Sequence, residues 1–468
     1  MSKDVLTRKL IGNELDESVA THRQKKVWAL AATGIGLDGY DLFVMSAALP
    51  LIMADFNQTS AWMSALFAGA AVLGAVPGAL LSGILSDKFG RRNILRLDVA
   101  MFGATAVLCA IAWNPASLIV FRFLQGFAVG AEYPISASMV AEVMPRANRG
   151  KWMTGAFAFQ AVGMVAAAFI STGLLFIINA DGAWRWMLLS CAIPSAIIAV
   201  MRRSIPESPR WLARKDRFDE AEESLDWLLG PEAVANVQRQ VAAARSVDEI
   251  EPKQASIKEL FHKKYRARTT LTSVPWFIMD IGLYGIGIFT PVILATLIHT
   301  SSSNSPNAFL AGDLKATATA AVADIFLVIG FIINIYSVER AGRIRLQILG
   351  FIGMAIGLTI VAFSGDGTDS TVWVLLGFVI FNLMVNVGPN ATTYLLPAEV
   401  FPTRLRSTGH GFAAACGKVG ATIGVFFLPS ATHAFGLGRT MLAIGIMCLL
   451  GAVITLMFRI ETKGMALE

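Results

Sequence analysis

Apolar residues dominate twelve stretches of this chain, and each stretch is long enough to cross a bilayer as a helix. A spanning helix needs about 20 mainly apolar residues. The candidate spans are centred near Gly36, Gly74, Ala104, Gly130, Val165, Ile193, Gly285, Phe326, Gly357, Phe381, Gly420 and Leu449. The pattern therefore predicts an all-α membrane protein with twelve transmembrane helices.

One long hydrophilic segment, rich in Arg, Lys, Glu and Asp, separates the sixth span from the seventh. The predicted organisation is a six-helix bundle over residues 1–202, a linker over residues 203–268 and a second six-helix bundle over residues 269–468. Only 15% of the 468 residues are charged and 55% are hydrophobic. Soluble domains average about 25% charged residues, so composition also favours a protein embedded in the lipid bilayer.

The charge distribution predicts the orientation of the chain. A net charge of +6 could indicate a nucleic-acid partner, but the basic residues collect in alternate loops, so we expect none. Basic clusters lie at residues 22–26, 88–92, 146–151 and 340–345 and in the linker, with Lys315 and Arg439 as exceptions on the other side. The positive-inside rule then predicts a multi-pass protein of the cell membrane with both termini and the linker in the cytoplasm. We expect no cleaved signal peptide, because the chain before Lys26 is polar.

A short loop motif occurs twice, at the same place in each half of the chain. The loop after the second span contains Asp87, Gly90 and Arg91, and the loop after the eighth contains Glu339 and Arg343 at the same spacing. In each loop a Gly before the Arg permits a tight turn, and the acidic residue can pair with the Arg or with a helix N-terminus. Two copies at equivalent positions indicate an internal repeat.

These features resemble the major facilitator superfamily over essentially the whole chain. The first loop is similar to that superfamily's Gly-x-Leu-x-Asp-x-x-Gly-Arg-Arg motif, Arg122 to Gly126 resembles its fourth-helix signature, and Pro206 to Leu212 resembles the element after helix six in sugar-porter-like members. The resemblance implies two bundles that rock about a central site. It implies a conformational motif at Asp87, Gly90, Arg91, Arg122, Glu339 and Arg343.

A polar face in the seventh span is the main candidate for chemistry. Trp276, Asp280 and Tyr284 are spaced i, i+4, i+8, so they share one helical face. An Asp at a membrane helix centre costs roughly 2.5–3.5 kcal/mol and marks a functional site by default. We interpret this face as half of a polar ligand site.

The polar positions resemble, more narrowly, the phosphate:proton symporters. Gly130 to Ala137 is similar to that group's Gly-Gly-Asp-Tyr-Pro-Leu-Ser-Ala, and Asp38 to Phe43 is similar to its Asp-x-Tyr-Asp-Leu-Phe, with Glu132 in place of Asp and Ala131 in place of Gly. The resemblance implies substrate ligands at Tyr133, Gln160, Trp276, Asp280, Tyr284, Asn390 and, more loosely, Lys418.

Carboxylates within the spans predict proton coupling. Chains of such groups mark proton relays, which favours Asp38, Asp41, Glu132 and Asp280; the alternative for the first three is pairing with Arg122 or with helix ends. Asp280 can accept a hydrogen bond from a phosphate hydroxyl, or it can carry a proton when the anion arrives. Sulfate has no proton near neutral pH and would be repelled.

Two further polar residues receive structural interpretations. His410 lies where the eleventh helix is expected to begin, and we interpret it as a helix-end histidine with satisfied hydrogen bonds, with a gating role as the alternative. Asp324 is an intramembrane carboxylate that no motif match supports.

The predicted function is a proton-coupled symporter that imports inorganic phosphate by alternating access and acts as a monomer. Arsenate shares the shape and protonation of phosphate and stays open as a second substrate. The alternatives are a symporter for an organic anion (an aromatic or hydroxy acid) or a sugar, and a receptor that binds without transport, although receptors usually carry long signalling extensions and these termini are short. We expect no enzyme, cofactor or metal, since the sequence has no nucleophile elbow, phosphate-binding Gly loop or metal-spaced His cluster.

Overall fold

Among the residues that the computed structural model describes (3–178, 182–243, 257–298, 306–364 and 370–463), twelve spans are long and apolar enough to cross a membrane. Every predicted centre falls within one of them, so the predicted all-α membrane fold of twelve transmembrane helices is confirmed. Residues 244–256 of the predicted linker lie outside the described residues.

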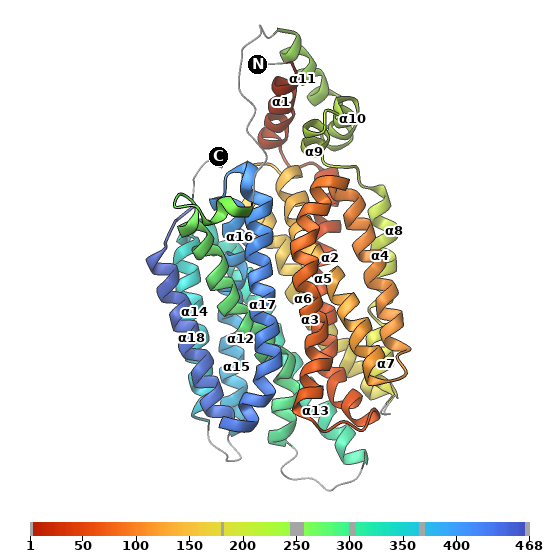
Figure 1. Ribbon diagram of the computed structural model, residues 1–468, viewed down its shortest axis with the longest axis vertical. Coiled ribbons are helices and arrows are strands. Elements are labelled where there is room, and N and C mark those ends of the chain that lie inside the picture. The colour runs from red at the N-terminus through yellow and green to blue at the C-terminus, as the bar shows by residue number, and fades with distance from the viewer. Residues whose placement is uncertain (1–2, 179–181, 244–256, 299–305, 365–369, 464–468) are drawn as a thin grey trace.

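The first six spans lie together on one side of Figure 1, coloured from red to yellow. They are α2 (His22–Asp55), α3 (Ala61–Phe89), α4 (Arg91–Ala110), α5 (Pro115–Val143), α6 (Arg149–Ile178) and the pair α7 (Ala183–Leu189) and α8 (Ala192–Met201), which continues into the 3₁₀ helix η1 (Arg202–Ser204).

The last six spans lie on the other side, coloured from green to blue (Figure 1). They are α12 (Arg266–Ile298), α13 (Pro306–Ala341), α14 (Arg343–Ala362), the pair α15 (Ser370–Val387) and α16 (Pro389–Val400), α17 (Thr403–Phe435) and α18 (Leu437–Met457).

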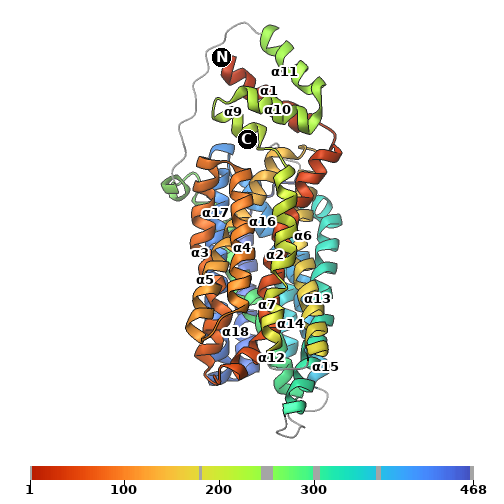
Figure 2. The same ribbon diagram turned by 90° about the vertical axis from the view of Figure 1, so that its right-hand side faces the viewer.

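Four further α-helices stand at one end of the bundles (Figures 1 and 2). They are α1 (Lys3–Glu17), α9 (Pro209–Arg214), α10 (Phe218–Leu229) and α11 (Pro231–Ala243), and the 3₁₀ helix η2 (Ile257–Phe261) precedes α12. A separate apolar cluster holds α1, α9, α10 and α11 to the first half, with Leu15, Trp211 and Leu225 among its buried members. We call this end the terminal face and the other end the opposite face.

Local sequence explains where the helices begin and turn. Thr21 and Asn114 form capping boxes at the starts of α2 and α5, which satisfy backbone N–H groups that have no partner within the helix. Gly90 and Gly342 separate α3 from α4 and α13 from α14 with φ of 95° and 90°, a region that residues with a Cβ rarely adopt. The two copies of the loop motif therefore have the same backbone turn.

Spans six and ten each consist of two helices. In span ten Gly388 breaks the helix (φ −124°, ψ −101°), and α16 begins at Pro389. Pro is favoured in the first turn of a helix, where it lacks only an N–H that would have no helical partner. The break places Asn390 at the start of a new helix deep in the protein.

The two halves meet mainly along α3 with α17, α6 with α13, and α2 with α12, and α6 and α5 also contact α16 and α17 respectively. Toward the opposite face the Trp62 and Phe426 rings lie 5.7 Å apart. At the terminal face a Cβ added to Gly150 of α6 would lie 2.7 Å from the Glu339 carboxylate of α13. One buried apolar cluster runs through both halves and includes Tyr133, Trp276 and Tyr284.

Candidate functional site

A buried polar cluster lies between the two halves, and six of the seven predicted ligands belong to it. Gln160 of α6 donates from Nε2 to the hydroxyl oxygens of Tyr133 on α5 (2.5 Å) and Tyr284 on α12 (2.8 Å), which lie 3.3 Å from each other. Asn390 of α16 donates to Gln160 Oε1 at 3.3 Å. The cluster thus joins side chains of the first half to side chains of the second.

Lys418 of α17 supplies the positive charge of this central cluster. Its Nζ donates to the Tyr284 hydroxyl at 2.9 Å and lies 3.6 Å from the Asp280 carboxylate. The same ammonium stands 4.5 Å and 4.3 Å from the ring centroids of Tyr133 and Tyr284, within the range of a cation–π interaction. Asp280 is 1% exposed, so this pairing offsets the cost of burying its charge. This ion pair was not predicted from the sequence.

Trp276 lies one helical turn from Asp280, and its indole also contacts aromatic rings of α16 and α17. Its ring lies 6.4 Å from the Tyr394 ring and 5.7 Å from the His410 ring, both in edge-on arrangements. It also packs on Gly417, where an added Cβ would lie 2.6 Å from the indole. The structure therefore places Trp276 at the end of the cluster, against the aromatic residues of α16 and α17.

The carboxylates of α2 and α5 form two separate ion clusters within the first half. Glu132 accepts from Arg202 at 2.6 and 2.9 Å, and Arg202 also lies 3.2 Å from Asp98. Asp41 accepts from Arg122 at 2.6 Å. The pairing of Asp41 with Arg122 is the alternative that the sequence left open.

Asp38 lies beside the ion cluster of Glu132, Arg202 and Asp98. It lines a small cavity of about 10 Å³ together with Asp98 and Glu132. Its Oδ2 is buried and has no hydrogen-bond partner among the described residues. Arg202 and Asp98 were missed from the sequence, although an Arg at the end of a predicted span was a visible signal.

Five of the six predicted conformational residues lie in one network per half at the terminal face, whereas Arg122 pairs with Asp41 instead. Arg91 lies 2.6 Å from Asp87 and 3.1 Å from Glu142, and Arg343 lies 2.9 Å from both Glu339 and Glu399. Glu142 and Glu399, near the ends of α5 and α16, were missed. They occupy equivalent places in the two halves, and a search for the internal repeat beyond the loop motif could have found them.

A carboxylate from a later segment caps each of the two helices that follow the repeated loops. Glu207 accepts from the backbone N–H groups of Arg91 (2.9 Å) and Arg92 (3.1 Å) at the start of α4. Glu461 does the same for Arg343 and Ile344 at the start of α14, at 3.1 and 3.2 Å. Burial raises the pKa of the Glu207 carboxyl above its ordinary value, although the backbone N–H donors oppose the shift.

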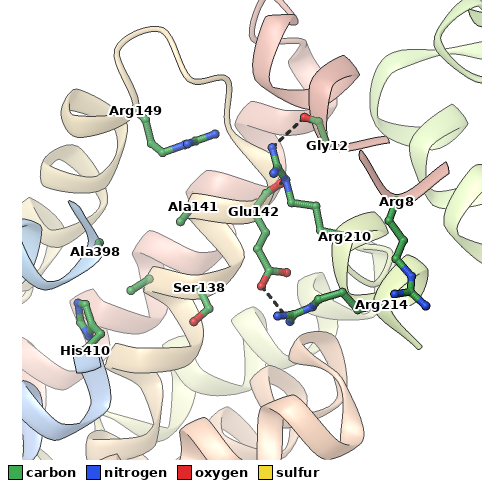
Figure 3. A pocket seen from close by; sticks show the side chains of 11 residues that line it. Arg8, Gly12, Ser138, Ala141, Glu142, Arg149, Arg210, Arg214, Ala398 and His410 are labelled. Carbon is green, nitrogen blue, oxygen red and sulfur yellow. Dashed lines mark hydrogen bonds and ion pairs between the residues drawn. The ribbon is translucent and has the colours of Figure 1, made fainter. Parts of the chain in front are cut away.

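A cavity of about 200 Å³ lies at the terminal end of the interface between the halves (Figure 3). Its lining comes from α1, α5, α6, α9, α16 and α17, and it includes Glu142, Arg149, Arg210, Arg214 and His410. His410 is 4% exposed and lies edge-on to Trp276. This cavity therefore approaches the central cluster from the terminal face.

Comparisons with known proteins agree on a family of transporters. The model of the sugar (and other) transporter family matches residues 27–468. The inner membrane metabolite transport protein YgcS of Escherichia coli (strain K12) is 30% identical over 431 aligned positions, covering 92% of this chain and 90% of that protein. Inorganic phosphate transporter 1-1 of Arabidopsis thaliana is 28% identical over 504 positions, covering 94% and 93%.

The solved structures show the same fold at lower identity. The structure of the major facilitator superfamily proton:xylose symporter XylE, bound to 6-bromo-6-deoxy-D-glucose, superposes with a TM-score of 0.76 at 20% identity and covers 96% of this chain and 98% of XylE. At that identity the likeness establishes the fold alone. Because the family model spans nearly the whole sequence, the chain belongs to the sugar (and other) transporter family of membrane proteins.

Proposed function

We propose that the protein is a proton-coupled symporter that imports inorganic phosphate by alternating access. The observation that carries the proposal is the central cluster, in which Lys418 lies 3.6 Å from the buried Asp280 carboxylate and joins it to the neutral donors Tyr284 and Gln160. Phosphate near neutral pH offers both acceptor oxygens and O–H donors, so it can bind donors and a carboxylate together.

The donor set fits an oxyanion. Tyr133, Gln160, Tyr284 and Asn390 converge from α5, α6, α12 and α16, and their hydroxyl and amide groups bond mainly to one another. An arriving anion can take over these bonds without leaving a donor unpaired. Lys418 then turns from Asp280 toward the anion, and Asp280 accepts a phosphate hydroxyl or takes a proton. Relatives named as inorganic phosphate transporters support this substrate.

Proton transfer in the first half falls to Asp38, Asp41 and Glu132. Asp41 and Glu132 each form an ion pair with an arginine, whereas Asp38 forms none among the described residues. Asp38 and Asp41 each have one buried carboxylate oxygen without a hydrogen-bond partner. We infer that Asp38 is the group of the three that exchanges a proton most readily, and that Arg122 and Arg202 hold the other two in place.

The moving parts follow from the interfaces between the halves. We infer that residues 1–202 and 269–468 rock as two bodies joined by residues 203–268, acting as a monomer in the cell membrane with the terminal face in the cytoplasm. Helix pairs rather than covalent loops form most of the contact between the halves. The network of Arg91 in the first half and that of Arg343 in the second half move toward each other when the terminal face closes. They move apart when it opens.

A symporter for an organic anion or a sugar is the second candidate. One observation favours an aromatic acid: Phe157 and Tyr394 stack at 4.2 Å beside Trp276, which gives the site an aromatic wall. The family also includes metabolite transporters.

Uptake of labelled phosphate into proteoliposomes tests the proposal, with a competition panel of arsenate, sulfate, benzoate and glucose. We expect phosphate uptake driven by an inward proton gradient, strong inhibition by arsenate and little by the other three. Dominant inhibition by benzoate or glucose would overturn phosphate as the substrate in favour of the second candidate.

A further inference from the structure

The terminal cavity of Figure 3 has a chemistry of its own that the central cluster does not use. Its volume of about 200 Å³ is several times the roughly 30 Å³ that one water occupies in the liquid. A tetrahedral oxyanion with part of its hydration shell fits in that space. The cavity has His410 in its wall (Figure 3), and the His410 ring contacts Trp276 at the end of the central cluster.

The charge on the cavity wall favours an anion. Arg8, Arg149, Arg210 and Arg214 line it, and Glu142 is the one carboxylate among the described lining residues. Arg149 and Arg210 both pair with Asp16 of α1. Each guanidinium has five N–H donors, so two arginines that share one carboxylate keep N–H groups that this carboxylate does not bind.

Arg214 is the most loosely held of the arginines whose contacts define the wall. It lies 3.7 Å from Glu142 and 3.8 Å from Asp87, and its side chain is 47% exposed. A charge-assisted hydrogen bond is usually about 2.7–2.9 Å long. Arg214 can therefore turn to an incoming anion without breaking a short ion pair.

His410 supplies an acceptor that needs a donor. Its Nε2 lies 3.1 Å from the backbone oxygen of Tyr394, so Nε2 carries the hydrogen of the neutral ring and Nδ1 is an acceptor. Nδ1 is buried without a hydrogen-bond partner among the described residues. A buried acceptor without a donor is costly, and the occupant of the cavity can supply the missing O–H group.

We propose that the terminal cavity is a second anion site, which takes a protonated tetrahedral oxyanion. The anion donates a hydroxyl to His410 Nδ1, and Arg149, Arg210 and Arg214 supply positive charge from the wall. Naming the anion as inorganic phosphate rests on the proposed function. A fully deprotonated oxyanion such as sulfate has no hydroxyl for His410, and Glu142 repels it, so the site prefers phosphate over sulfate.

Equilibrium dialysis of labelled phosphate against the full chain in nanodiscs tests the site. Lys418→Ala disables the central cluster, and we expect wild type to bind two phosphate ions and this variant to bind one. Adding His410→Phe keeps an aromatic ring against Trp276 but removes the acceptor, and we expect the residual affinity to fall about 3- to 10-fold, the effect of roughly one hydrogen bond. His433→Phe is the matched control, because His433 lies at the other end of the same helix and is exposed, and it should change nothing.

The possible results separate this site from the proposed function. If wild type binds one phosphate and Lys418→Ala binds none, the second site does not exist although phosphate is a ligand. If sulfate displaces the residual phosphate as well as phosphate does, the arginines alone hold an anion and the role of His410 is overturned. If wild type neither binds nor transports phosphate, the proposed function fails instead. If Lys418→Ala does not fold, the test uses His410→Phe and His433→Phe in the wild-type background. Only His410→Phe should lower the phosphate affinity of one of the two sites.

Two sources of the anion are then distinguished in proteoliposomes. If the bound phosphate is in transit from the central cluster, His410→Phe should slow phosphate counterflow. If the bound phosphate instead enters from the medium at the terminal face and stays, phosphate on that side should inhibit uptake by wild type but not by His410→Phe. Either result supports the site, and an unchanged variant in both assays contradicts it.

Discussion

At the scale of single residues, Asp280 is the group on which coupling depends in the proposed function. It lies 3.6 Å from Lys418 in a cluster that excludes solvent. Asp280→Asn keeps the shape but cannot exchange a proton. We expect phosphate accumulation driven by a pH gradient to disappear, while phosphate counterflow slows by about tenfold or less, roughly the loss of one charged hydrogen bond. Both are measured in proteoliposomes.

The matched control for Asp280→Asn is Asp324→Asn. Asp324 is another buried carboxylate of the second half, but its Oδ1 accepts from Asn382 at 3.1 Å on α15 rather than from a group of the central cluster. The Asp324→Asn variant should keep proton-driven accumulation of phosphate. Full accumulation by Asp280→Asn, or an equal loss in both variants, would contradict a specific coupling role for Asp280.

Sequence reasoning located most of the central residues but not their partners. The spacing of Trp276, Asp280 and Tyr284 and the resemblance of α5 to a known motif were enough to select residues that the fold brings together. The ion pair of Asp280 with Lys418 and that of Glu132 with Arg202 join different helices, the latter across 70 positions in sequence. Helical periodicity describes only one helix at a time, so such pairs depend on tertiary packing that it does not encode.

At the scale of elements, the caps of α4 and α14 show how a remote carboxylate fixes a helix start. Two N–H groups of α4 donate to Glu207. Glu207→Ala leaves them without that acceptor, and we expect a loss of about 0.5–2 kcal/mol, the usual worth of a helix cap. Glu207→Gln keeps an amide oxygen in place and should be close to neutral. Apparent melting temperatures in detergent measure both, with the exposed Glu220→Gln as control.

The pH dependence of the same cap has a definite sign. Because burial raises the pKa of Glu207 in the folded chain above its ordinary 4.5, the folded state binds this proton more readily than the unfolded state. Its contribution to stability is therefore fully present below pH 4.5 and is lost as pH rises through the folded pKa. The melting temperature of wild type relative to Glu207→Gln should fall as pH rises above 4.5. A difference that grows with pH would contradict the assignment.

Element boundaries follow the same division between local and tertiary causes. Twelve apolar stretches predicted twelve spans, because the requirement for about 20 apolar residues is local. The break at Gly388 was missed, since nothing in the apolar pattern distinguishes it from the many glycines that pack helices closely. It places Asn390 within reach of Gln160 on the other half of the molecule.

At the scale of the whole molecule, the halves meet at both faces around the central cluster. At the terminal face, a Cβ on Gly150 would lie 2.7 Å from the Glu339 carboxylate and 2.9 Å from the Arg343 guanidinium. Gly150→Trp therefore prevents closure at this face. We expect it to lower phosphate uptake and counterflow by more than about tenfold, since a single blocked state stops the cycle. Gly173→Trp is the matched control on the same helix, because a Cβ there meets nothing within 4 Å.

Phosphate binding to Gly150→Trp separates a blocked cycle from a damaged site. The central cluster does not include Gly150, so equilibrium dialysis should show phosphate binding within about threefold of wild type, a difference near 0.65 kcal/mol. Lys418→Ala, in contrast, should lose binding at the central cluster and uptake together. If Gly150→Trp transports at the wild-type rate, the halves do not need to close at the terminal face, and alternating access between these two bodies is wrong. If it loses binding as well as uptake, the effect of the Trp reaches the cluster itself. Binding without transport is the result that two rocking halves predict.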